Sequence, residues 1–258
     1  MTTTPEDLRY NVSDRVAEIS LARPPVNALS LSLLERLVAA LRRAAADQNV
    51  RAVVLTSALP HRFSAGLDLA MMSGKPVMDM RRLLETLYVD LFDAQYNLGK
   101  PSVAAVGGAA RGGGMTLAIS CDVLVAGRRA TFGYPEIDLG LIPAIHFVHL
   151  PRIVGRHRAF EILFSGRVFG ADEAATLGLV SRVVPDGEVR DEARAIARAF
   201  AAKPGIAMRL GRAAFMRVND LDYRRGIGEA VEQFCNAAAT AEAQEGLRAF
   251  IEKRSPNW

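Results

Sequence analysis

Residues 111–121 read Arg-Gly-Gly-Gly-Met-Thr-Leu-Ala-Ile-Ser-Cys, so three glycines lead directly into an apolar segment of helical character. Glycines let the backbone turn tightly and bring main-chain N–H groups close to a ligand. The first N–H groups of a helix have no partner within it and carry a partial positive charge. We therefore expect this stretch to stabilise an oxyanion.

A plain glycine-rich loop is the alternative interpretation. No Gly-Lys-Ser/Thr follows, which excludes a P-loop, and no Gly-x-Gly-x-x-Gly opens a helix, which excludes the dinucleotide fingerprint. A second glycine turn, Phe-Ser-Ala-Gly-Leu-Asp-Leu at 63–69, offers a second N–H. Phe-Gly-Tyr-Pro-Glu at 132–136 offers one carboxylate in apolar company. Two backbone donors and one acid indicate enolate chemistry on a carbonyl compound.

The composition is that of a soluble globular protein. The chain has 258 residues, 50% hydrophobic and 23% charged, with a net charge of +4. The basic excess forms no run, which argues against nucleic acid and suits an anionic small molecule. Cys121 and Cys235 make no disulfide framework. No signal peptide and no apolar run of about 18 residues is visible, so we expect a cytoplasmic protein without a membrane span.

The hydrophobic pattern predicts an α/β protein. A capping box at 32–35 opens a helix that continues to Leu41. The other expected elements are strands over 16–21, 53–56, 102–106, 123–126 and 180–184, and helices over 81–98, 115–120, 192–202, 206–218, 228–238 and 241–253. We expect an α/β core at 1–190 with the site, followed by a helical region at 191–258.

Several motifs in order resemble the crotonase superfamily, which contains the enoyl-CoA hydratases and isomerases. These motifs are Arg-Pro-Pro-Val-Asn-Ala-Leu at 23–29, the turn at 63–69, the glycines at 112–114, Cys-Asp at 121–122, Phe-Gly-Tyr-Pro-Glu at 132–136, Leu-Gly at 139–140, Gly-Leu-Val at 178–180 and Phe-Ile-Glu-Lys-Arg at 250–254. The resemblance covers essentially the whole chain. It implies a spiral of ββα units and a C-terminal helical region that builds homo-trimers or hexamers.

The resemblance also implies an acyl-CoA thioester substrate, with coenzyme A as part of the substrate and no separate cofactor or metal. The thioester oxygen would bind between the backbone N–H groups of Leu67 and Gly113. Arg62 precedes the first turn, where a cation could meet a CoA phosphate, although a solvated loop charge is an equal alternative, and Ala65 in the turn is a second candidate CoA contact. Phe234 and Lys253 match positions that in relatives reach the CoA of an adjacent subunit, although internal packing and solvent exposure are their ordinary roles.

The sequence departs from the hydratase pattern at one catalytic position. Hydratases of the superfamily use two glutamates; here the first position holds Thr116, and the second is retained as Glu136. Threonine cannot act as a carboxylate, whereas a single base can move a proton between two carbons. We therefore favour an enoyl-CoA isomerase in which Glu136 is the acid/base. Its apolar neighbours predict a pKa shifted toward neutrality.

A second departure lies at 142–150, Ile-Pro-Ala-Ile-His-Phe-Val-His-Leu, where hydratases carry a glycine-rich run. Its bulkier residues predict a narrower or differently shaped acyl pocket. His146 and His149 would share a helix face, and no third ligand suggests a metal site. Packing is the favoured role for both, with His146 as an alternative second acid/base.

Two other functional interpretations stay open. The first is a hydratase or another acyl-CoA lyase or hydrolase of the same fold. The second, from a different class, is a non-catalytic CoA- or RNA-binding relative, against which the retained Glu136 and the absence of a basic cluster argue.

Overall fold

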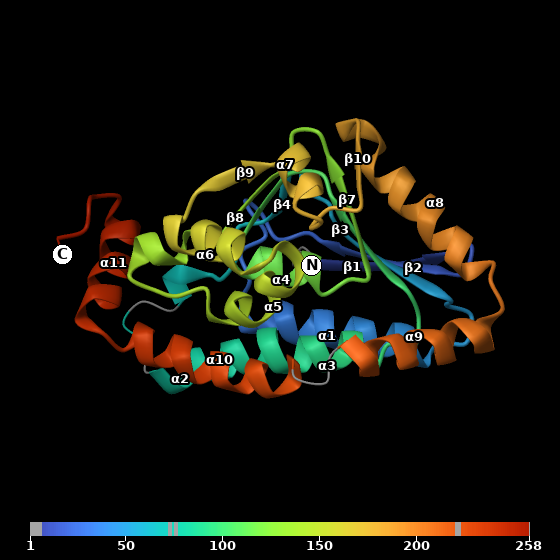
Figure 1. Cartoon of the computed structure of the whole chain (residues 1–258), viewed down its shortest axis with the longest axis horizontal. Coiled ribbons are helices and arrows are strands. Elements are labelled where there is room, and N and C mark those ends of the chain that lie inside the picture. The colour runs from blue at the N-terminus through green and yellow to red at the C-terminus, as the bar shows by residue number, and fades with distance from the viewer. Residues whose placement is uncertain (1–6, 72–73, 75–76, 220–222, 258) are drawn as a thin grey trace, which may run out of the picture.

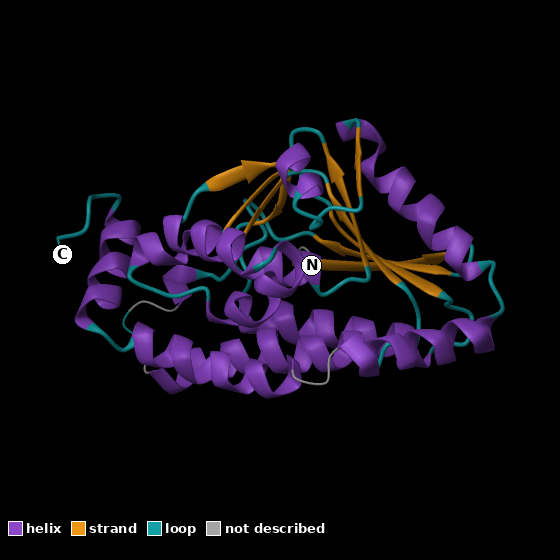
Figure 2. Cartoon of the chain, in the orientation of Figure 1, coloured by secondary structure: helices purple, strands orange, loops and turns teal. Residues whose placement is uncertain are grey.

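The computed structural model describes residues 7–71, 74, 77–219 and 223–257. Within them the chain forms two sheets with helices packed around them (Figures 1 and 2). The larger sheet has the strand order β1 (Leu8–Ser13), β2 (Val16–Leu21), β3 (Ala52–Ser57), β5 (Ser102–Val106), β7 (Val123–Gly127) and β10 (Arg182–Val184). The smaller sheet has the order β4 (Arg62–Ser64), β6 (Ala109–Arg111), β8 (Thr131–Gly133) and β9 (Val168–Gly170).

The two sheets are built by a repeating ββα unit. A strand of the larger sheet is followed by a short strand of the smaller sheet and then by helix, and this happens at β3–β4, at β5–β6 and at β7–β8. Neighbouring strands of successive units pair in parallel in both sheets. The chain therefore advances as a spiral, which confirms the predicted fold.

Successive side chains of a strand point to opposite faces of the larger sheet, and helices cover both faces. Val53 and Leu55 belong to the main core with α1 (Leu31–Ala46), whereas Ala52 and Val54 face a second core under α8 (Val189–Ala201). Small residues of α8 allow this helix to lie close to the sheet, as Figure 1 shows. The first helix of the C-terminal region is thus a layer of the α/β core.

The start of α1 differs from the expected capping box at 32–35. Ser30 is the N-cap, and its side chain accepts a hydrogen bond from the N–H of Leu33 at 3.2 Å. The helix therefore begins at Leu31, so Glu35 lies too far along it to reach back to the cap.

The other helical segments pack against the sheets or against one another. The predicted helix at 81–98 is divided into α2 (Val77–Leu84), a π-helical turn η2 (Glu85–Asp90) and α3 (Leu91–Tyr96). The remaining segments are η1 (Leu69–Met71), α4 (Gly113–Ile119), η3 (Pro135–Leu139), α5 (Ala144–Val154), α6 (Arg156–Ser165), α7 (Ala171–Thr176), η4 (Asp186–Glu188), α9 (Gly205–Asn219), α10 (Tyr223–Ala238) and α11 (Ala241–Glu252). Across the described segments, no helix combines the length and apolar character needed to cross a membrane.

A partly buried ion pair fixes α9 against the core. The Arg212 guanidinium donates to both carboxylate oxygens of Asp122, at 2.9 and 3.1 Å, and to the carbonyl of Gln95 at 2.8 Å. The Asp122 carboxylate also accepts from the N–H of Ser102 at 2.8 Å, at the start of β5. The Arg212 side chain is 6% exposed and that of Asp122 is 18% exposed, so the buried guanidinium has a carboxylate partner at the protein surface.

We expect Arg212→Leu to lower the free energy of unfolding by about 1–3 kcal/mol, because it removes the charge-assisted hydrogen bonds that join α9 to Asp122 and Gln95. Urea unfolding at fixed protein concentration measures the change. Arg209→Leu, at an exposed position of the same helix, is the matched control and should change stability by less than about 0.5 kcal/mol. Equal effects of the two substitutions would contradict a stabilising role for the pair.

Candidate active site

Two backbone turns meet at the start of α4. Gly66 has φ +87°, and a Cβ atom there would lie 2.8 Å from the carbonyl oxygen of Arg111 and 3.2 Å from the nitrogen of Gly113. A Cβ on Gly114 would collide in the same way with Ser64. Glycine at both positions is therefore what allows the turn after β4 to lie directly against α4.

The N–H groups of Leu67 and Gly113 are the backbone donors at this junction. The bridge between Leu29 and Leu67 uses the carbonyl of Gly66 and the N–H of Asp68, so it leaves out the N–H of Leu67. Gly113 is the first residue of α4, so its N–H has no acceptor within the helix. A Cβ on Gly113 would lie 3.6 Å from the Leu67 nitrogen, which shows how close the two donors are.

Side-chain hydrogen bonds hold the first turn in place. The Ser64 hydroxyl donates to the carbonyl of Asn27 at 2.8 Å and accepts from the N–H of Gly66 at 3.2 Å. Asp68 forms an ion pair with Arg23 at 2.8 Å. This contact gives Asp68 a structural role in holding the turn.

Glu136 lies on η3, opposite the glycine triplet. A Cβ on Gly112, which has φ +47°, would collide with the Glu136 Oε1 atom, so the carboxyl group sits directly against the backbone of the triplet. Its Oε2 atom is inaccessible to solvent and has no hydrogen-bond partner among the described residues. Burial raises the pKa of Glu136 to about 7, in agreement with the desolvated carboxyl expected from its neighbours.

Thr116 contacts a histidine instead of presenting an acid. Its Oγ1 atom lies 3.3 Å from Nε2 of His146, which comes from α5. His146 is 1% exposed, and its ring centroid lies 4.3 Å from that of Tyr134. Burial lowers the pKa of His146 to about 3, so the imidazole is neutral at pH 7. The pairing of these two residues was not predicted from the sequence.

The predicted CoA contacts lie in different surroundings. Arg62 and Ala65 are exposed beside the first turn, and Arg62 lines a cavity of about 410 Å³ together with His61 and Arg129. Lys253 is exposed at the end of α11. Phe234 is 1% exposed and packs in the core of its own chain, so its side chain presents no surface to a ligand.

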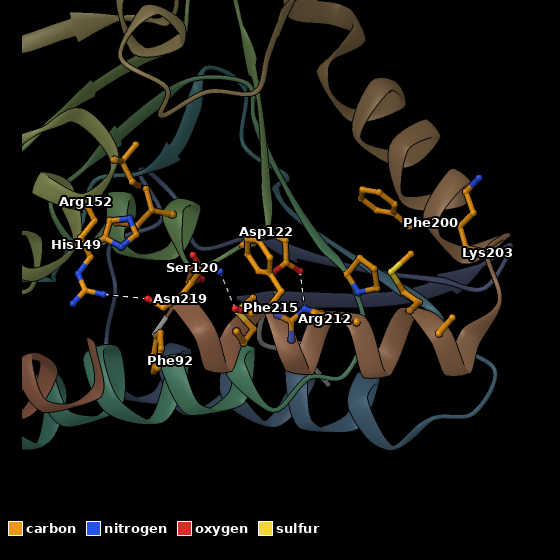
Figure 3. Close-up of a pocket in the computed structure, with 18 of the residues that line it drawn as sticks. Phe92, Ser120, Asp122, His149, Arg152, Phe200, Lys203, Arg212, Phe215 and Asn219 are labelled. Carbon is orange, nitrogen blue, oxygen red and sulfur yellow. Dashed lines mark hydrogen bonds and ion pairs between the residues drawn. The ribbon is translucent and has the colours of Figure 1, made fainter. Parts of the chain in front are cut away.

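A larger groove of about 940 Å³ lies at the C-terminal end of α4, where Ile119 and Ser120 line it, and it was not predicted from the sequence. Figure 3 shows α9 along this groove with Phe215 and Arg212, Phe200 from α8 at one end, and His149 from α5 at the other. His149 therefore lines this groove, whereas His146 does not. The described residues contain no cluster of three His, Cys, Asp or Glu side chains suited to a metal ion.

Comparison with known proteins places this arrangement in a family. The sequence model of the family "Enoyl-CoA hydratase/isomerase" matches residues 11–258. A probable enoyl-CoA hydratase of Mycobacterium bovis is 34% identical over 265 residues, covering 99% of this chain and 98% of that protein.

Solved structures agree with the sequence comparison. The enoyl-CoA hydratase/isomerase of Pseudoalteromonas atlantica T6c superposes with a TM-score of 0.85 at 31% identity, covering 98% of this chain and 100% of that one. Human mitochondrial Δ3-Δ2-enoyl-CoA isomerase superposes with a TM-score of 0.85 at 28% identity, covering 96% of this chain and 98% of that one. The chain therefore belongs to the enoyl-CoA hydratase/isomerase family, within the crotonase superfamily.

Proposed function

We propose that this protein is an enoyl-CoA isomerase that moves a double bond from the Δ3 to the Δ2 position with Glu136 as its acid/base. The observation that carries the proposal is the buried Glu136 carboxyl, with a pKa of about 7, facing a position where Thr116 and the neutral His146 replace a second acid. A proton shuttle works best when its pKa lies near the working pH.

The proposed reaction begins with the thioester oxygen between the N–H groups of Leu67 and Gly113. Glu136 removes a proton from the α-carbon, and the electron pair delocalises into the thioester carbonyl and the neighbouring double bond. The two donors stabilise the resulting dienolate, and such a donor typically contributes about 2.7–4 kcal/mol. Glu136 then returns the proton to the γ-carbon, which leaves the double bond in conjugation with the thioester.

An enoyl-CoA hydratase is the second candidate, because the relatives carry mostly that name. Hydration needs one group to activate water and another to deliver a proton to the α-carbon. In this chain Thr116 and His146 would have to position the water between them. Assaying both activities on one preparation therefore separates the two candidates.

The proposal includes the contacts to coenzyme A. Arg62 and the neighbouring His61 line a cavity close to the first turn, where they suit the phosphates of CoA. Arg129 also lines it but is paired with Asp186. Ala65 is exposed beside Leu67, where its backbone borders the path of the substrate. Lys253 stays a proposed contact to the CoA of a neighbouring subunit, whereas the burial of Phe234 removes that residue from the proposal.

We expect Glu136→Gln to reduce isomerisation of a 3-enoyl-CoA by about 10²–10⁴-fold, because glutamine cannot accept the α-proton. Affinity for the CoA ester should stay within about threefold of wild type, since the oxyanion donors belong to the backbone. Product formation is followed by the absorbance of the conjugated thioester and by mass. Asp138→Asn, an exposed carboxyl on the same turn, is the matched control and should retain activity. Activity of folded Glu136→Gln protein near the wild-type level would end the single-base mechanism.

The same substitution has a predicted effect on stability that distinguishes a base from a structural brace. The pKa of Glu136 rises from 4.5 to about 7 on folding, so the folded state binds the extra proton between these values. Stability of the wild type therefore falls as the pH rises through this interval, and glutamine removes that loss. We expect Glu136→Gln to be more stable than wild type at about pH 8 and to match it near pH 4.5, as measured by urea unfolding. A less stable variant at about pH 8 would indicate that Glu136 braces its turn.

We further propose that the chain assembles as a homo-trimer or hexamer. Ile206, Leu210 and Val218 of α9 are 70%, 62% and 81% exposed, which is unusual for large apolar side chains unless a partner covers them. Sedimentation equilibrium at micromolar concentration should give three or six times 27.9 kDa. Leu210→Glu should shift the distribution toward smaller species. A wild-type monomer would contradict the proposal.

A further inference from the structure

A very small cavity adjoins the oxyanion donors. It has a volume of about 10 Å³, and its lining includes Leu87, Leu91, Thr116 and Ile145. A Cβ on Gly113 would lie 3.0 Å from the Cδ2 atom of Leu87, so Leu87 links the lining of the cavity to the Gly113 donor. A volume of this size holds about one water-sized probe.

A thin wall separates this cavity from the large groove. Phe92, Ile119 and Ser120 line both the 10 Å³ cavity and the 940 Å³ groove. All three are partly exposed, so one side of each contacts the groove while the other closes the cavity. Figure 3 shows Phe92 and Ser120 among the residues that line the groove.

The wall is placed by two features of the fold. Phe92 follows the π-helical turn η2, in which the N–H of Leu91 bonds to the carbonyl of Thr86, five residues earlier. Such turns recur at functional sites, where they shift the side chains that follow. Ile119 ends α4, six residues after Gly113, so the helix that supplies a donor also supplies the wall.

We propose that Phe92 and Ile119 restrict this protein to short-chain acyl thioesters by separating the acyl cavity from the large apolar groove. The inference rests on the proposed binding of the thioester at Leu67 and Gly113, which directs the acyl chain past Thr116. A short acyl chain ends before it reaches the wall. A long chain meets the wall, beyond which the groove has the volume of a ligand pocket.

Binding of saturated thioesters tests the proposal without any chemical step. Calorimetry with butyryl-CoA and dodecanoyl-CoA should show that wild type binds the longer ester no more tightly than the shorter one. In an acyl pocket without such a wall, each further buried methylene strengthens binding by about fourfold. Tighter binding of dodecanoyl-CoA to wild type by about tenfold or more would overturn the proposal.

Opening the wall should connect the two spaces. Ile119→Ala and Phe92→Ala are each expected to raise affinity for dodecanoyl-CoA by about tenfold or more while affinity for butyryl-CoA stays within about threefold. Phe200→Ala, on the groove wall away from Phe92 and Ile119, is the matched control and should change neither affinity. Unchanged chain-length profiles in both folded wall variants would overturn the proposal.

A double variant tests whether the long chain enters the groove. Gly211 lines the groove, and a Cβ there meets no atom within 4 Å, so a phenylalanine at this position fits and occupies the open space. Adding Gly211→Phe to Ile119→Ala should abolish the gain for dodecanoyl-CoA and leave butyryl-CoA binding intact. A gain that survives the second substitution would show that the chain takes another path, against the proposal.

The experiments distinguish failure of the chain-length inference from failure of the isomerase proposal. If 3-enoyl-CoA is not isomerised but the binding profiles follow the expected pattern, the isomerase assignment fails and the chain-length inference stands. If isomerisation occurs and the profiles are unchanged, the inference fails alone. If wild type binds neither thioester, both proposals fail.

Discussion

The close approach of the turn at Gly66 to the start of α4 is the contact on which the rest of the site depends. No side chain fits at Gly66 or Gly114, because the opposing backbone already occupies the space that a Cβ would need. The two turns belong to successive ββα units, so the parallel pairing of β4 with β6 sets their separation. Both donors are backbone atoms, and their position is therefore fixed by the register of the spiral.

The glycine triplet also determines the environment of Glu136. Because Gly112 has no side chain, the carboxyl group can lie against the backbone, away from solvent. Desolvation destabilises the charged form, which raises the pKa and makes the group a better proton shuttle near pH 7. The same desolvation lowers the stability of the folded state above the shifted pKa. Catalytic competence and reduced stability thus share one physical cause.

The sequence predicted the parts of the structure that local patterns control. The apolar strands, the long helices and the glycine turns follow from side-chain periodicity and backbone freedom, and the order of motifs indicated the spiral. The predicted N-cap of α1, Ser32, was wrong, and Ser30 is the N-cap instead. Both serines precede the same apolar run, so the local pattern did not distinguish them. The contact of Thr116 with His146 and the wall at Phe92 and Ile119 could not be predicted, because residues distant in sequence meet there only through packing.

Thr116 connects the chemistry of the proposed site with its shape. A glutamate here would place a second carboxylate in a buried region beside Glu136, and the like charges would raise one pKa further. A threonine hydroxyl is much less costly to bury, and His146 satisfies it while staying neutral. Thr116 also lines the small acyl cavity. The replacement of an acid by threonine therefore leaves Glu136 as the titrating group of the proposed mechanism and forms a neutral wall for the acyl chain.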